Sequence, residues 1–246
     1  MPSLLHLDSS ILGENSVSRA LSAAVVARLK NLDPTIDVVY RDLAAHPIPH
    51  LSGSYVAVVR GGLEAGHDAA LQADLELGGN VLEEFLAAET VVLGVAQYNF
   101  SVPSQLKAWI DRIAIPGKTF RYTEKGPESL VGSKRVIIAL ARGGFYAPGS
   151  PAENFEHTLS YLKSVFAFIG IANPEVIVAD GINVSSEQRD ASLKEAKAQI
   201  AGLKAAKVNS NARALKASRS PVNHREDGMS APSSLGANRL RAAAIP

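Results

Sequence analysis

The chain has 246 residues, of which 46% are hydrophobic and 20% charged, so it is long enough to form one sizeable hydrophobic core. It contains no cysteine, which excludes disulfide bonds, thiolate catalysis and cysteine-based zinc or iron–sulfur sites. No apolar stretch approaches the roughly 20 residues of a membrane span, and the N-terminus has no signal-peptide pattern. We therefore expect a cytoplasmic protein that does not enter a membrane.

The net charge of +1 hides a difference between two parts of the chain. Residues 204–246 carry eight Lys and Arg against two acidic residues, which leaves residues 1–203 net acidic. Because residues 204–246 also lack aromatic residues and a clear apolar period, we expect a basic, disordered extension there. Residues 1–203 are expected to form a single domain. They lack the basic, aromatic-rich patch of a nucleic-acid-binding protein.

Short apolar runs alternate with helical patterns five times along residues 1–203. The expected strands are residues 3–7, 36–43, 90–96, 134–141 and 175–180. The expected helices are residues 16–32, parts of 52–88, 104–114, about 150–169, and a last one from 185 into the 200s. This alternation is typical of α/β proteins with right-handed crossovers. We predict a flavodoxin-like, doubly wound, five-stranded parallel sheet with strand order 2-1-3-4-5.

Local signals predict where some of these helices begin or break. The stretch Ser150-Pro151-Ala152-Glu153 matches a capping box with proline at the first helical position, and therefore predicts a helix start. The stretch Ser185-Ser186-Glu187-Gln188 predicts another helix start in the same way. Two adjacent glycines, Gly78 and Gly79, each cost roughly 1 kcal/mol in a helix interior, so we expect a break or kink there.

The loop after the first strand predicts a phosphate site. In a doubly wound sheet the ligand lies beyond the carboxyl ends of the strands. The loop sequence DSSILGENSVS lacks the glycine pattern of a dinucleotide-binding loop and the Gly-Lys-Ser/Thr of a P-loop. The hydroxyls of Ser10, Ser16 and Ser18, with the free N–H groups of the next helix, suit one phosphate monoester. A purely structural explanation, in which Ser16 only caps the helix, fits this loop equally well.

The sequence QYNF at the end of the third strand predicts a surface for a flat, polar-edged ligand. Tyr98 and Phe100 supply apolar faces, while Asn99 and its neighbours supply amide donors and acceptors. An isoalloxazine ring needs this combination of a flat surface and hydrogen bonds to its polar edge. Either aromatic residue taken alone is explained as well by an ordinary place in the core.

The sequence ARGG at the end of the fourth strand adds a third cluster. Gly143 and Gly144 allow backbone N–H groups to approach a ligand closely. Such donors would stabilise negative charge on the pyrimidine end of a reduced flavin. A tight turn would also explain the two glycines. The occurrence of all three clusters at three strand ends is what favours a ligand site.

Five stretches resemble, in order, the FMN-dependent NADH azoreductases, which are flavodoxin-like NAD(P)H:quinone reductases. They are SSILGENSVS, RDLAAHPIP, QYNFSVPSQLKAWIDRI, GKTFRYTEKGPESLVGSK and ARGG. The resemblance covers most of residues 1–203. It implies FMN as the cofactor, NADH or NADPH as the electron donor, and a quinone or azo compound as the acceptor. It also implies a homodimer with the flavin sites at the subunit interface.

The same resemblance implies which residues bind FMN. The phosphate would be held by Ser10, Ser16, Val17 and Ser18. The ring would contact Gln97, Tyr98, Asn99 and Phe100, and would border on Ala141, Arg142, Gly143 and Gly144. Two positions depart from the family motifs, because Gln97 stands where methionine is usual and Ala141 stands where serine is usual.

The chemistry implied by the resemblance is a two-electron, ping-pong hydride transfer that is centred on the flavin and needs no catalytic side chain. Phe120, Arg121 and Tyr122 are expected near the acceptor, with a structural loop before the fourth strand as the alternative. Arg60 is a candidate for binding the phosphates of the nicotinamide cofactor, and a solvated surface arginine is its alternative explanation.

Two other classes of function stay open at this point. A non-enzymatic electron carrier of the flavodoxin type would need a strongly acidic docking face, for which the charge of residues 1–203 gives little support. An FMN-binding interaction protein would use its basic extension to recruit a partner. No metal site is expected, because Pro47 and Pro49 prevent His46 and His50 from sharing a helical face.

Overall fold

The computed structural model describes residues 2–61 and 68–205, which belong to one compact unit, Met1–Ala206. Five strands form a parallel sheet in the order β2-β1-β3-β6-β7. They are β1 (Ser3–Asp8), β2 (Asp37–Asp42), β3 (Thr90–Ala96), β6 (Arg135–Ala141) and β7 (Glu175–Ala179). Counted within this sheet, the order is 2-1-3-4-5, as predicted. The expected basic extension falls, apart from Lys204 and Ala205, outside the described residues.

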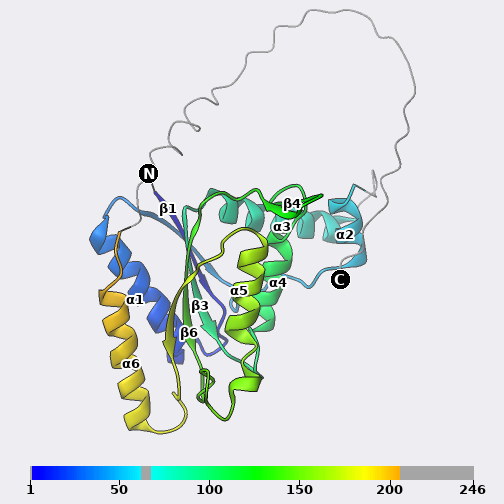
Figure 1. Cartoon of the computed structure of the whole chain (residues 1–246). Coiled ribbons are helices and arrows are strands. Elements are labelled where there is room, and N and C mark those ends of the chain that lie inside the picture. Colours follow the sequence, from blue (N-terminus) through cyan, green and yellow to red (C-terminus); the bar gives the residue numbers. More distant parts are fainter. Residues whose placement is uncertain (1, 62–67, 206–246) are drawn as a thin grey trace, which may run out of the picture. The chain divides into compact units, whose positions relative to one another are not determined.

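Helices cover both faces of the sheet (Figure 1). On one face lie α1 (Val17–Leu32) and α6 (Ser186–Ala201), and on the other lie α3 (Ala69–Ala87), α4 (Ser104–Ile113) and α5 (Thr158–Phe168). A short helix, α2 (Gly53–Val59), packs on α3. Within the part of the chain that the structure describes, no helix is long and apolar enough to cross a membrane.

Side chains of β3 alternate between two hydrophobic clusters, which explains why every residue of this strand is buried. Val91, Leu93 and Val95 pack in the cluster under α3, α4 and α5, while Val92 packs in the cluster under α1 and α6. A strand that is covered on both faces has to be apolar on both faces. The continuous apolar run in the sequence therefore predicted the central place of this strand correctly.

The start of α5 differs from the prediction. Residues Glu153–Phe155 form only a 3-10 turn, η2, and α5 begins at Thr158. The carboxylate of Glu156 accepts hydrogen bonds from the backbone N–H groups of Thr158, Leu159 and Ser160, at 3.2, 2.8 and 3.0 Å. This acid thus satisfies the first free N–H groups of the helix, and Glu153 instead accepts from the N–H of Gly149 at 2.7 Å.

Residues 120–129 form an antiparallel hairpin, which was not among the predicted strands. Its strands are β4 (Phe120–Thr123) and β5 (Gly126–Ser129), with Gly126 at φ +104° after the turn. The alternation of apolar and polar residues in FRYT, followed by a glycine, was the signal available for this hairpin.

The predicted break in the helix at Gly78 and Gly79 is wrong, because α3 runs without interruption through both glycines. Gly78 is needed for packing instead: a Cβ there would overlap the hydroxyl and ring of Tyr55 on α2. The guanidinium of Arg112 lies 3.8 Å from the centre of the same ring and holds it in place. A long-range contact therefore explains a glycine that looked like a local breaker.

The loop after β1 is anchored by Arg19 of α1. Its guanidinium donates to the carbonyl of Ser10 at 3.0 and 2.8 Å, and to the carboxylate of Asp42 at 2.6 and 2.7 Å. The hydrogen bond and charge of Arg19 lower the pKa of Asp42 to about 2. Nearby Tyr40, which donates to Asp8 at 3.1 Å, has its pKa raised to about 12, mainly by burial and then by the charge of Asp8. Arg19 thus ties the carboxyl ends of β1 and β2 to the start of α1.

The two adjacent glycines of α3 should respond to alanine in opposite directions. Gly78→Ala should lower the free energy of unfolding by roughly 1–3 kcal/mol, because the new methyl group displaces Tyr55. Gly79→Ala has no atom within 4 Å of its new Cβ and should raise stability by about 0.5–1 kcal/mol. Urea denaturation of the two variants measures both changes, and equal effects of the same sign would refute the packing role of Gly78.

The ion pair between Arg19 and Asp42 should make stability depend on acid pH. Since folding lowers the pKa of Asp42 from its usual 3.8 to about 2, its contribution is present above about pH 4 and is lost as the pH falls towards 2. Asp42→Asn should therefore be less stable than the natural chain by roughly 1–2 kcal/mol at pH 7. Urea denaturation between pH 7 and 2 should show this gap narrowing below pH 4, and a constant gap would contradict the ion pair as its source.

Candidate functional site

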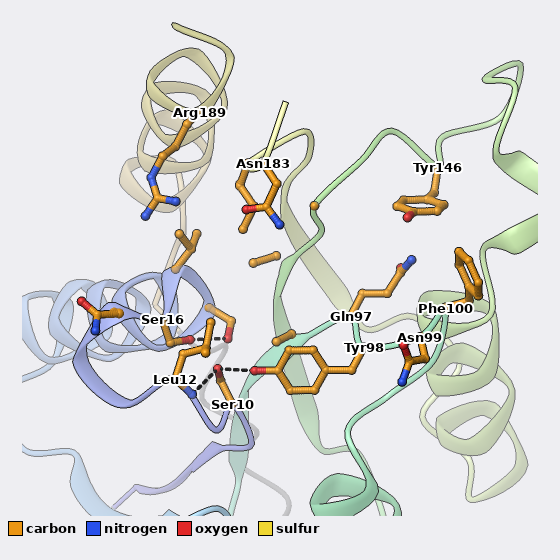
Figure 2. Close-up of a pocket in the computed structure, with 17 residues that line it drawn as sticks. Ser10, Leu12, Ser16, Gln97, Tyr98, Asn99, Phe100, Tyr146, Asn183 and Arg189 are labelled. Atoms are coloured by element: carbon orange, nitrogen blue, oxygen red, sulfur yellow. Dashed lines mark hydrogen bonds between the residues drawn. The ribbon is translucent and has the colours of Figure 1, made fainter. Parts of the chain in front are cut away.

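A pocket of about 340 Å³ lies at the carboxyl end of the sheet, where the loops after β1, β3, β6 and β7 meet. Figure 2 shows these segments converging on the space between α1, α6 and the loop that carries Tyr98. The volume is in the range of small-molecule and cofactor pockets, roughly 300–1,000 Å³. Its position is the one at which doubly wound sheets bind their ligands.

One end of the pocket is lined by the predicted phosphate-binding residues. They are Ser10, Ser16, Val17 and Ser18, all of them buried. The Oγ atoms of Ser16 and Ser18 lie 3.1 Å apart, and Ser16 also caps α1 by accepting from the N–H of Arg19 at 3.3 Å. Ser16 therefore caps the helix and lines the pocket at the same time. The N–H groups of Val17 and Ser18, in the first turn, have no acceptor within the helix itself.

The other end of the pocket is lined by Gln97, Tyr98, Asn99 and Phe100, the four residues that the sequence grouped together. Tyr98 and Ser101 exchange two backbone hydrogen bonds of 3.0 Å around a turn whose central residues, Asn99 and Phe100, have φ values of 46° and 70°. Left-handed backbone at two successive non-glycine residues costs roughly 1–2 kcal/mol for each residue. Such strain persists where it positions side chains that are needed.

A hydrogen bond connects the two ends of the pocket. The hydroxyl of Tyr98 lies 2.9 Å from the Oγ of Ser10, and the N–H of Leu12 donates to the same Oγ at 3.3 Å. Figure 2 shows both interactions as dashed lines: the first joins the loop after β1 to the loop after β3, and the second lies within the loop after β1. The ring of Tyr98 thus lies across the floor of the site with its position fixed at the hydroxyl end.

Two further aromatic rings, those of Phe155 and Tyr146, lie next to Phe100. The ring of Phe100 is 45% exposed, and its centre lies 5.1 Å from that of Phe155 and 6.4 Å from that of Tyr146. Tyr146 lines the pocket together with Phe100. The result is a partly exposed aromatic surface at the mouth of the pocket.

Only some residues of the ARGG sequence, 141–144, line the pocket, and the others support it. Ala141 and Gly143 line the pocket, whereas Arg142 and Gly144 do not. The buried guanidinium of Arg142 pairs with Asp180 at 2.5 and 2.7 Å, and so holds the ends of β6 and β7 together. The carbonyl of Gly143 accepts from the N–H of Asn183 at 3.1 Å. The backbone of this cluster is therefore joined to the loop after β7.

Several lining residues were missed by the sequence analysis. They are Leu12, Asn15, Ala96, Tyr146, Ile182, Asn183 and Arg189. Three of them follow β7, whereas the predicted site was limited to the ends of the first, third and fourth strands of the sheet. The available signal was the loop DGINVSS, whose position after the fifth strand places it at the same edge.

The residues suggested for the acceptor or donor do not line this pocket within a single chain. Phe120 is buried in the core and packs on Phe168, with 4.6 Å between ring centres. Tyr122 is 59% exposed on the hairpin, next to an exposed ion pair between Arg121 and Glu128. Arg60 follows the last residue of α2. Their proposed roles would require a second chain or a large substrate.

The chemistry of these donors fits FMN. Hydroxyl and backbone N–H groups at one end suit one phosphate, and they lack the glycine-rich approach that a pyrophosphate requires. Aromatic faces and amides at the other end suit a flat ring with a polar edge. No group of three His, Asp or Glu side chains that could hold a metal ion occurs in residues 2–61 and 68–205.

Comparison with known proteins agrees with this description. Residues 2–203 match the family described as having a flavodoxin-like fold. The FMN-dependent NADH:quinone oxidoreductase of Methylorubrum extorquens strain PA1 is 55% identical over 203 residues, which cover 82% of this chain and 99% of that protein. The enzyme of the same name from Xanthomonas campestris pv. campestris is 52% identical over 201 residues, covering 81% and 98%.

Solved structures give the same result. An azoreductase from Bacillus anthracis str. Sterne superposes with a TM-score of 0.71 at 29% identity, covering 82% of this chain and all of that one. An FMN-dependent NADH-azoreductase from Bacillus anthracis str. Ames Ancestor, solved in complex with FMN, gives a TM-score of 0.72 at 25% identity and covers 81% and 98%. The chain therefore belongs to the flavodoxin-like family, within the group of FMN-dependent NADH:quinone oxidoreductases and azoreductases.

Proposed function

We propose that this chain is an FMN-dependent NADH:quinone oxidoreductase that also reduces azo compounds. The observation that carries the proposal is one pocket with hydroxyl and backbone N–H groups suited to a phosphate at one end and a positioned aromatic and amide surface at the other. When bound there, FMN would accept a hydride from the nicotinamide cofactor and pass two electrons to the acceptor. The relatives with this name, at more than half identity, support the assignment.

In this proposal the phosphate end of the pocket fixes the cofactor. The hydroxyls of Ser10, Ser16 and Ser18 and the N–H groups of Val17 and Ser18 would bind the phosphate oxygens. The positive end of the α1 dipole adds to this binding. Because these groups are buried and held by capping, little rearrangement is needed when the phosphate enters.

The ring end of the pocket would orient the flavin by stacking and amide hydrogen bonds. The hydroxyl of Thr158 donates to Oε1 of Gln97 at 3.2 Å, which leaves the NH₂ group of that side chain as a donor towards the pocket. The backbone N–H of Gln97 is already bonded to the carbonyl of Ala141 at 3.0 Å. The amide side chain therefore offers a hydrogen bond that methionine, usual at this position in the family, would lack.

Acceptors would bind on the aromatic surface formed by Phe100, Tyr146 and Phe155. Flat quinones and azo compounds both suit stacking on such rings, which supports the two acceptor classes together. No Asp, Glu or His occurs among the described residues that line the pocket, so protons for the acceptor would come from hydroxyl groups or water.

A homodimer with the acceptor site at the subunit interface is also part of this proposal. Phe155 is 50% exposed and Tyr122 is 59% exposed, so each presents an apolar ring that a second chain would cover. In such a dimer the exposed ring of Tyr122 on the hairpin would border the partner's pocket, while Phe120 stays in the core of its own chain. The cytoplasmic location expected from the sequence stays a prediction.

An anaerobic visible spectrum of the purified protein tests the function directly. A flavin band near roughly 450 nm should be bleached by NADH and should return when a quinone is added, because hydride enters and leaves through the bound cofactor. Free FMN at the same concentration, without protein, is the control and should be reduced far more slowly.

Two outcomes would contradict the proposal in different ways. Bound flavin that responds to neither NADH nor NADPH would favour an electron carrier. Absence of bound flavin after incubation with FMN would show that the pocket, with Gln97 and Ala141 at two motif positions, does not hold this cofactor.

A further inference from the structure

Arg189 is the only charged residue among the described residues that line the pocket. It lies in α6, one turn after the N-terminus of that helix, and Figure 2 shows it on the side of the pocket where Ser16 lies, across from Phe100 and Tyr146. Its helix packs beside α1 in the same hydrophobic cluster. Since α1 and α6 both begin at the carboxyl edge of the sheet, this cation is carried close to the first turn of α1.

The other two arginines near the site are already paired. Arg19 is bonded to Asp42, and Arg142 is bonded to Asp180. Arg189 has no ion pair and no side-chain hydrogen bond with any residue of 2–61 or 68–205. It is half-buried, so its charge is screened less than that of a fully exposed arginine. The guanidinium is thus available for an anion inside the pocket.

We propose that Arg189 binds the phosphate of FMN and makes the pocket selective for the phosphorylated cofactor over riboflavin. This inference rests on the proposed function. A phosphate monoester carries a charge of about −1.5 to −2 near pH 7. The serine hydroxyls and backbone N–H groups around it supply no formal positive charge, so the guanidinium of Arg189 is the group that can balance this anion. A guanidinium also matches phosphate oxygens in a bidentate fashion.

The same guanidinium could instead bind the pyrophosphate of the nicotinamide donor. The position of Arg189 at the serine end of the pocket, away from the aromatic surface, favours the phosphate of FMN. An experiment can distinguish these two ligands. If Arg189 binds the phosphate of FMN, its removal lowers the affinity for FMN even when no nicotinamide donor is present.

The test is a comparison of FMN and riboflavin binding to full-length protein from which flavin has been removed. Quenching of flavin fluorescence gives the dissociation constants for the natural chain, Arg189→Ala and Arg189→Lys. Arg189→Ala should bind FMN about 10- to 100-fold more weakly and riboflavin within about 2-fold of the natural chain. Arg189→Lys should recover part of the FMN affinity, because it restores the charge without the planar fork.

Lys194→Ala is the matched control. It removes the same charge from an exposed position of α6 that does not line the pocket, and should leave both affinities unchanged. Thermal unfolding without flavin should give the same midpoint for Arg189→Ala and the natural chain. Raising the salt concentration should weaken FMN binding more in the natural chain than in Arg189→Ala.

Three results would overturn the inference. Equal losses of FMN and riboflavin affinity in Arg189→Ala would mean that the side chain only supports the fold of the pocket. Unchanged FMN affinity would mean that it does not bind the phosphate, and an accompanying rise in the KM for NADH would assign it to the donor. If the natural chain itself binds no FMN, the proposed function fails, which is a different result from failure at Arg189 alone.

Discussion

The close packing of α1 against the sheet fixes the position of the serines at the start of that helix, at the phosphate end of the pocket. Gly94 of β3 makes this packing possible: a Cβ there would overlap the carboxylate of Asp8 and lie 2.8 Å from the Oγ of Ser22. Ser22 in turn donates to Asp8 at 2.7 Å and lies 3.0 Å from Nε2 of His6. This buried polar network therefore sets the distance between α1 and the sheet. It thereby also sets the position of the serines at the start of α1.

The ring end of the pocket is fixed by a different means. There the chain leaves β3 in a strained turn rather than in a helix, and the strain is offset by the paired hydrogen bonds of Tyr98 and Ser101 and by packing of Phe100 on Phe155. The hydrogen bond between Tyr98 and Ser10 joins this turn to the loop before α1. A displacement of either loop would therefore move the other loop as well. This coupling suits a site that must hold one rigid ligand at both ends.

The sequence predicted the parts of this arrangement that depend on local pattern. Apolar runs located the strands, and the Ser16 cap and QYNF were placed at strand ends because a parallel sheet brings those ends to one edge. It did not predict features that depend on contacts distant in the chain. Gly78 looked like a helix breaker because its partner, Tyr55, lies on another helix. Phe120 looked like a site residue, and only the packing against Phe168 shows that it belongs to the core.

The arginines near the site have two different roles: two of them form ion pairs within the chain, and the third, at the pocket, is unpaired within the part of the chain that the structure describes. Arg19 and Arg142 are each bound in bidentate fashion to an aspartate, so they stabilise loops and contribute little net charge to the pocket. If they were the ligand-binding cations, entry of an anion would have to compete with Asp42 or Asp180. Arg189 has no such competitor among the described residues. The paired arginines, Arg19 and Arg142, therefore maintain the shape of this site, while the unpaired Arg189 at its border remains available for the charge of a ligand. The sequence does not distinguish these two uses, because each of the three is a single arginine in a segment that follows a strand.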